Sequence, residues 1–194
     1  MTMIDVLAEI YANEGIHLRG LSRKLKLSLP AVKNQVNKLL KEKLIVKKQE
    51  GRNLKLYLNR KNRFLTPYLC QIEYMRLKSL PKNVVDALFD LLAMLENKPL
   101  MAIIFGSYAK GTYTKKSDID VMLVFNKTDS EAEKKARIIG SRHGIHIEPI
   151  YLSWGSFRKK FFDEKDSFMK EFRENKIIAV GIEYWELLEN EVPA

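Results

Sequence analysis

"IIFGSYAKGTYTKKSDIDVMLVF", residues 103–125, predicts two apolar strands joined by a Gly-Ser turn and a polar loop. Because side chains alternate along a strand, Asp118 and Asp120 should face one way while Ile119 and Val121 enter the opposite layer. Two carboxylates this close cannot both stay charged in an interior without a cation between them. We expect Mg²⁺, since it is hard, prefers oxygen ligands and usually accompanies phosphates.

The Gly-Ser turn provides a second kind of binding group. Leu100–Phe105, "LMAIIF", has the length of a strand, and Gly106-Ser107 then begins one or two helical turns. A strand–Gly–helix junction directs free backbone amides at one spot, which favours a phosphate. Gly106 lets a ligand approach the backbone, and Ser107 adds a hydroxyl donor. This phosphate site and the acid pair should meet if the two strands are neighbours.

The motif "GSYAKGTYTKKSDIDVMLVF" resembles the signature of the DNA-polymerase-beta-like nucleotidyltransferase superfamily. It is most similar to the minimal nucleotidyltransferases, whose turn usually reads Gly-Ser-x-Ala-Arg-Gly. Lys110 stands at the arginine position, so the positive charge is kept while bidentate phosphate contact is lost. The resemblance implies a third acid on a later strand, and "GIHIEPIYL" offers Glu148. Pro149 after it indicates an edge strand or the end of a strand.

The resemblance covers about residues 99–190 and implies a complete site. Two Mg²⁺ ions and a nucleoside triphosphate, with ATP the expected one, would bind there. The expected catalytic and metal-binding residues are Asp118, Asp120 and Glu148, and the expected nucleotide contacts are Gly106, Ser107, Lys110 and Ser117. His146 is interpreted as filling the end of the Glu148 strand, with contact to substrate or metal as the alternative.

Two further segments belong to this C-terminal region. Residues 153–172, "SWGSFRKKFFDEKDSFMKEF", mix bases and aromatics; a helix packed on the sheet is favoured over the lining of a substrate groove. Residues 176–188, "KIIAVGIEYWELL", are expected to be a last strand or helix with Trp185 in the core.

Charge is distributed unevenly along the 194 residues. Residues 1–60 contain 13 Lys or Arg against 5 Asp or Glu, whereas residues 61–194 contain 21 against 19. Nearly all of the net charge of +10 therefore lies in the first third. This asymmetry indicates a nucleic-acid-binding segment joined to a different kind of domain.

The basic segment has the pattern of three helices and a hairpin. Apolar spacing predicts helices over Met3–Ala12, Leu18–Leu27 and Pro30–Lys43, and "IVKKQEGRNLKLYL" predicts two short strands around a turn. The arrangement resembles a winged helix-turn-helix, which implies double-stranded DNA as a partner. The expected DNA contacts are Lys33, Asn34, Asn37, Lys38 and Lys41 on the third helix and Lys47, Lys48 and Arg52 on the hairpin. A helical module for dimerisation or partner docking is the alternative.

We therefore expect an α+β chain of three parts: a winged helix-turn-helix domain at 1–60, a helical connector at 61–98 interrupted at Pro67, and a nucleotidyltransferase fold at 99–194 with a small mixed sheet flanked by helices. No apolar run reaches the length of a membrane span, and the first residues do not form a secretion leader. With the single cysteine, Cys70, this predicts a cytoplasmic protein.

The predicted function is Mg²⁺-dependent transfer of a nucleoside monophosphate from a triphosphate to an unidentified acceptor. The alternative is a transcriptional regulator or an antitoxin whose C-terminal fold binds nucleotide, or a helical toxin-like partner, without catalysis. A homodimer is expected if the N-terminal part recognises a palindrome, because two half-sites require two recognition helices.

Overall fold

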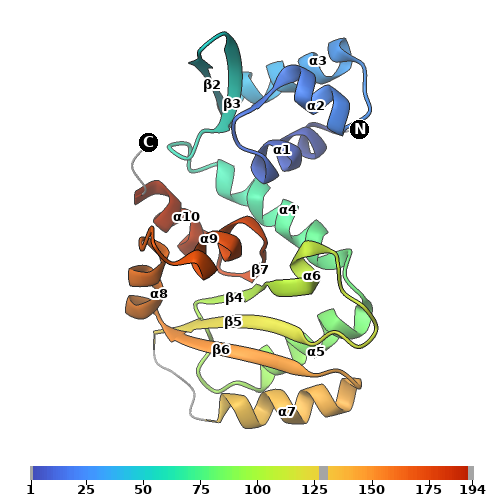
Figure 1. The fold of residues 1–194 in the computed structure, drawn as a ribbon, viewed down its shortest axis with the longest axis vertical. Coiled ribbons are helices and arrows are strands. Elements are labelled where there is room, and N and C mark those ends of the chain that lie inside the picture. The colour runs from blue at the N-terminus through green and yellow to red at the C-terminus, as the bar shows by residue number, and fades with distance from the viewer. Residues whose placement is uncertain (1, 127–130, 192–194) are drawn as a thin grey trace. The chain divides into compact units, whose positions relative to one another are not determined.

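The computed structural model describes residues 2–126 and 131–191. The chain divides into two compact units, Met1–Ile72 and Glu73–Ala194 (Figure 1). Among the described residues, no helix is long and apolar enough to cross a membrane.

The N-terminal unit contains the three expected helices and the expected hairpin, so this part of the fold is confirmed. A two-residue strand that the sequence pattern did not reveal adds a third strand, and the sheet order is β1-β3-β2 with antiparallel pairing. The elements are α1 Met3–Ala12, β1 Ile16–His17, α2 Leu18–Lys24, α3 Leu29–Lys41, β2 Ile45–Glu50 and β3 Asn53–Leu58.

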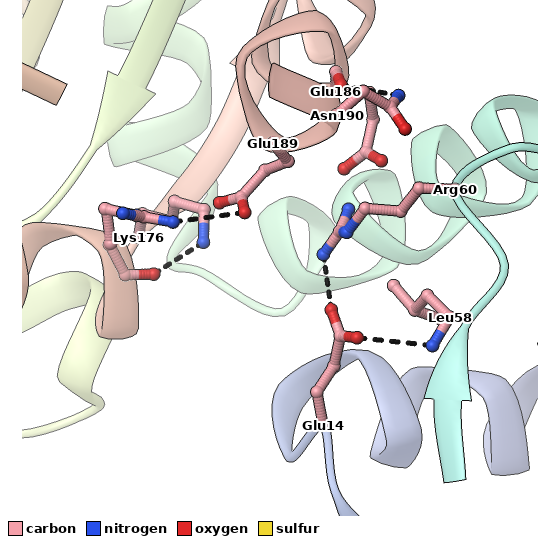
Figure 2. A network of polar contacts seen from close by, with 8 residues as sticks. Glu14, Leu58, Arg60, Lys176, Glu186, Glu189 and Asn190 are labelled. Atoms are coloured by element: carbon pink, nitrogen blue, oxygen red, sulfur yellow. Dashed lines mark hydrogen bonds and ion pairs between the residues drawn. The ribbon is translucent and has the colours of Figure 1, made fainter. Parts of the chain in front are cut away.

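Polar contacts of Glu14 fasten the hairpin to the loop that follows α1. Leu58 N donates to Glu14 Oε2 at 3.2 Å, and Arg60 forms an ion pair with the other carboxylate oxygen (Figure 2). Together with the pairing of Ile16 and Leu56, these contacts fix where the end of β3 lies relative to α1.

Two helices follow, α4 Leu65–Lys78 and α5 Lys82–Met94. The prediction that Pro67 interrupts the first of them is wrong. Pro67 is the third residue of α4, where a backbone amide has no intrahelical partner, so proline is tolerated there. The boundary between the two units falls inside α4, between Ile72 and Glu73.

The C-terminal unit is built on a four-stranded mixed sheet in the order β6-β5-β4-β7 within the described residues. β5 and β6 are parallel and the other neighbours are antiparallel, as a small mixed sheet requires. β6 lies at an edge, in agreement with the position of Pro149. The elements are β4 Met101–Ile104, α6 Gly106–Lys110, β5 Ile119–Phe125, α7 Ala132–His143, β6 Ile147–Ser153, α8 Trp154–Phe161, α9 Ser167–Glu174, β7 Ile177–Val180 and α10 Ile182–Glu191.

Helices cover both faces of this sheet (Figure 1). On one face, Val121, Leu123 and Phe125 of β5 belong to a core cluster with Leu88 of α5 and Ile139 of α7. Asp120 alternates with these residues along β5, so its side chain is directed to the opposite face.

Helices α8, α9 and α10 pack through aromatic rings. Trp185, only 1% exposed, lies within 6.3 Å, centroid to centroid, of Phe157, Phe161 and Phe172. Lys176 Nζ donates to the carbonyl of Arg173 at 2.6 Å, and Arg173 forms an ion pair with Glu189 at 3.1 Å (Figure 2). The end of α9 is thereby fixed to α10.

Candidate active site

The Gly-Ser turn and the Asp-x-Asp pair meet because β4 and β5 are neighbouring antiparallel strands. Ile104 pairs with Val121, and Phe105 N donates to the carbonyl of Asp120 at 3.0 Å. Gly106 has φ +63°, and a Cβ built there would lie 2.0 Å from Asp120 Oδ2. A side chain at Gly106 would therefore occupy the place of the Asp120 carboxylate. The expected proximity of the two motifs is confirmed.

The three predicted acids lie at one end of β5 and β6. Asp120 and Glu148 are opposite each other in the parallel register, and Asp118 directly precedes β5. Asp120 is half-buried, whereas Asp118 and Glu148 are exposed. Burial, and then the charges of Glu148 and Asp118, raise the pKa of the Asp120 carboxyl. The acids are thus close enough to repel one another.

These acids do not form a preassembled ligand set. Within residues 2–126 and 131–191, no three His, Cys, Asp or Glu side chains lie close enough to share one metal ion. His146 Nδ1 lies 3.5 Å from Asp118 Oδ1, and the His146 side chain is 60% exposed. The interpretation that His146 fills the end of the strand is therefore wrong.

A cavity of about 220 Å³ opens beside Gly106 and Asp120. Its wall also includes Phe105, Lys110 and four residues at α9 that lie about 50 residues further along the chain: Phe168, Glu171, Phe172 and Asn175. The wall combines polar side chains with aromatic rings. Within the segment 153–172, α8 packs on β5 and β6, as favoured, and α9 lines this cavity.

The remaining predicted nucleotide contacts are distributed differently. Lys110 lines the cavity and forms an ion pair with Glu171. Ser107 lies half-buried in the first turn of α6. Ser117 Oγ accepts a hydrogen bond from Thr114 N at 2.9 Å and so organises the loop before β5. Among the described residues, the cavity wall includes Gly106 and Lys110 but neither of these serines.

Sequence reasoning missed the wall contributed by α9. Residues 167–174 have an amphipathic pattern that marks Met169 and Phe172 as buried. The same pattern carries no information about what the other face of the helix lies against. The structure shows this through the pairing of Lys110 with Glu171 and the contact of Phe105 with Phe168.

The predicted DNA-binding side chains share one property, which is exposure. Val32, Val36 and Leu39 are buried on the inner side of α3. The outer side and the hairpin present exposed residues, namely Lys33, Asn34, Asn37, Lys38, Lys41, Lys47, Lys48 and Arg52. A polar and basic surface is therefore available for a polyanion.

Comparison with known proteins agrees with this geometry. The family model described as nucleotidyltransferase domain matches residues 85–178, and the model described as winged helix-turn-helix DNA-binding matches residues 2–46. A curated relative from Methanocaldococcus jannaschii, named "Putative protein adenylyltransferase", is 32% identical over 84 residues, which are 41% of this chain and 84% of the relative. The chain belongs to the nucleotidyltransferase family. It also carries a winged helix-turn-helix domain.

Two solved structures are similar over parts of the chain. One is the multiple antibiotic-resistance repressor (MarR) from Listeria monocytogenes, at 21% identity and a TM-score of 0.30, covering 46% of this chain and 66% of the repressor. The other is a "putative nucleotidyltransferase" from Sulfolobus solfataricus, at 23% identity and a TM-score of 0.29, covering 45% of this chain and 78% of that protein. The family assignment rests on the family models and the curated relative.

Proposed function

We propose that the chain transfers a nucleoside monophosphate from a triphosphate to an acceptor hydroxyl in a Mg²⁺-dependent reaction. The observation that carries this proposal is the contact between Gly106 and Asp120. It places a backbone that a phosphate can approach next to a carboxylate suited to a metal, beside a cavity lined by polar and aromatic residues.

The donor set fits Mg²⁺, which we propose is held by Asp118, Asp120 and Glu148. All three are carboxylates, the hard oxygen ligands that Mg²⁺ prefers. Their mutual repulsion, which contributes to the raised pKa of Asp120, would be relieved by a cation. Asp118 and Glu148 are exposed, so their side chains have room to turn toward a shared ion. Bound Mg²⁺ would neutralise phosphate charge and lower the pKa of the acceptor hydroxyl.

The other residues bind and orient the substrates. Gly106 and Ser107 would contact the β- and γ-phosphates through backbone amides, and Lys110 would add positive charge. The acceptor oxygen attacks the α-phosphorus, the bond from that phosphorus to the bridging oxygen breaks, and pyrophosphate leaves. Glu148 takes the hydroxyl proton, because it is an exposed carboxylate opposite Asp120.

The name of the M. jannaschii relative points to ATP as the donor and a protein as the acceptor. We propose the same pair for this chain, in the cytoplasm. We propose a helical toxin-like protein as the first acceptor to test.

Residues 1–60 are proposed to bind double-stranded DNA as a dimer, with residues 61–98 connecting them to residues 99–194; α5, the second helix of that connector, packs in the core of the transferase unit. The exposed lysines and asparagines of α3 and the hairpin support this role.

The test is incubation of the full-length protein with each α-³²P-labelled triphosphate, Mg²⁺ and cell extract. We expect label on an acceptor with ATP, and a loss of several orders of magnitude with Asp120→Asn while the circular dichroism spectrum is kept. Asp86→Asn, an exposed position on α5, is the matched control and should keep full activity. Equal labelling by wild type and Asp120→Asn contradicts the proposal.

A second candidate is a regulator that binds nucleotide without transferring it. The winged helix-turn-helix domain matched over residues 2–46 favours it. This candidate predicts nucleotide binding with no labelled acceptor, and a DNA affinity that changes when nucleotide is added.

A further inference from the structure

The strongest unassigned feature is the α9 wall of the cavity that Gly106 and Asp120 also line. Besides Asn175, the wall presents two kinds of group. Phe168 and Phe172 form an aromatic surface, and Glu171 presents a carboxylate. Phosphates suit neither group, since they are anionic and polar. A nucleobase suits both.

The aromatic surface has an exposed ring that a ligand can contact. The rings of Phe168 and Phe172 are stacked at 5.8 Å with an interplanar angle of 24°, and Phe105 contacts both rings edge-on. Phe172 is 2% exposed, while Phe168 is 41% exposed at the rim. The buried ring thus supports an exposed one, which leaves the outer ring available for stacking with a base.

Glu171 pairs with Lys110, and this pair is easily exchanged. The Lys110 side chain is 39% exposed and that of Glu171 is 61% exposed. A surface pair of this kind contributes at most about a fivefold preference. A triphosphate, which carries several negative charges, competes strongly for Lys110. Glu171 is then left as an acceptor-only carboxylate beside the aromatic surface.

We propose, on the basis of the proposed nucleotidyltransferase function, that α9 is the base-recognition element and that Glu171 selects bases with an exocyclic amino group. The amino group of adenine or cytosine donates a hydrogen bond to the Glu171 carboxylate while Phe168 stacks on the ring. An oxo group at the same position of hypoxanthine or uracil presents an acceptor to a carboxylate and is repelled. Binding would thus exchange the Lys110–Glu171 ion pair for contacts of both side chains with one nucleotide.

Matched nucleotide pairs test this directly. ATP and inosine triphosphate differ at the C6 amino or oxo position and at N1, which carries a hydrogen only in hypoxanthine, and CTP and UTP differ in the same way at C4 and N3. Each pair shares the same phosphates and the same ring size, so the ratio of the two dissociation constants isolates the contact with the base. Isothermal titration calorimetry of the full-length protein with MgCl₂ gives these constants without requiring an acceptor.

Wild type should bind ATP over inosine triphosphate, and CTP over UTP, by about tenfold or more, the scale of a hydrogen bond to a charged group. Glu171→Gln should bring both ratios to about two or less, because an amide both donates and accepts. Glu174→Gln, an exposed neighbour on α9 with the same loss of charge, should keep the wild-type ratios. Phe168→Ala should weaken all four nucleotides by about tenfold without changing the ratios.

The outcomes separate the two proposals. Binding of all four nucleotides with ratios near one in wild type overturns base selection and leaves the transferase proposal standing. Ratios that persist in Glu171→Gln overturn the role of Glu171. A wild-type protein that binds none of the four nucleotides removes the proposed function and this inference with it.

Discussion

Gly106→Ala is the substitution whose effect the structure defines most closely. Two separate costs arise at this position. The first is conformational, because Gly106 has φ +63° and an L-residue with a side chain pays about 1–2 kcal/mol in the left-handed region. The second is steric, because the new Cβ would lie 2.0 Å from Asp120 Oδ2, 2.8 Å from its Cγ and 3.3 Å from its Cβ.

The steric cost affects the site directly. Since the carboxylate itself stands where the methyl group would be, Asp120 must turn away from the cavity. Overpacking of this kind adds about 1–3 kcal/mol. A displacement of about 1 Å at a catalytic group costs roughly a hundredfold in rate. Gly106→Ala should therefore lower the stability of the C-terminal unit by about 2–5 kcal/mol and the transfer rate by about a hundredfold or more.

Gly111→Ala supplies the matched control. Gly111 has φ +71°, and no described atom lies within 4 Å of a Cβ built there, so it bears the conformational cost alone. Both tryptophans of the chain, Trp154 and Trp185, belong to the C-terminal unit, so urea unfolding followed by their fluorescence reports on that unit. If Gly106→Ala and Gly111→Ala lose equal stability and equal transfer activity, the contact with Asp120 has no functional weight and the reasoning is refuted.

Three further predictions concern other parts of the chain. Glu73, 1% exposed, accepts a hydrogen bond from Ile178 N at 2.9 Å. Glu73→Ala should lower the free energy of unfolding, measured in urea, by about 1–3 kcal/mol, and Glu73→Gln should lower it less. Equal losses in the two variants would contradict this role. At the start of α9, the hydrogen bond from Met169 N–H, and then Lys160, lower the pKa of Asp166. The stability that Asp166 adds is therefore present at neutral pH and is lost as pH falls through that lowered pKa. Acid unfolding of Asp166→Asn should depend less on pH than that of the wild type, and an unchanged dependence would count against the contact. The double variant Lys38→Ala, Lys41→Ala should reduce the slope of log affinity against log salt concentration for duplex DNA by about 1.8. The control variant Lys82→Ala on α5 should leave the slope unchanged. A slope that does not change in the double variant would exclude α3 from the interface.

The sequence was sufficient wherever structure follows from local periodicity. Val6, Leu7 and Ile10 define the buried side of α1, and the predicted and observed bounds of that helix agree. The alternation of Ile119 and Val121 against Asp118 and Asp120 likewise placed the acids on the side opposite the core cluster. Both patterns depend only on residues within one element.

What the sequence did not reveal depends on distant residues or on position within a helix. β1 is two residues long and exists because Ile16 and His17 pair with Leu56 and Lys55. A proline breaks a helix in its interior but not in its first turn. The sequence pattern did not show that α4 begins at Leu65, which places Pro67 in the first turn.

The α9 wall of the cavity could not be predicted from the sequence for the same reason. Lys110 and Glu171 are 61 residues apart in the chain, and no periodic pattern connects them.

The central claim is that the carboxylates of β5 and β6 bind a divalent ion beside a nucleotide whose phosphates contact the Gly106 turn. A crystal structure with a non-hydrolysable ATP analogue and Mn²⁺ in place of Mg²⁺ tests it most directly, because Mn²⁺ is located by its anomalous signal. We predict an anomalous peak about 2.0–2.3 Å from oxygens of Asp120 and at least one of Asp118 and Glu148, with the triphosphate at Gly106 and Ser107. A nucleotide bound elsewhere, or carboxylates turned away from the ion, would contradict it.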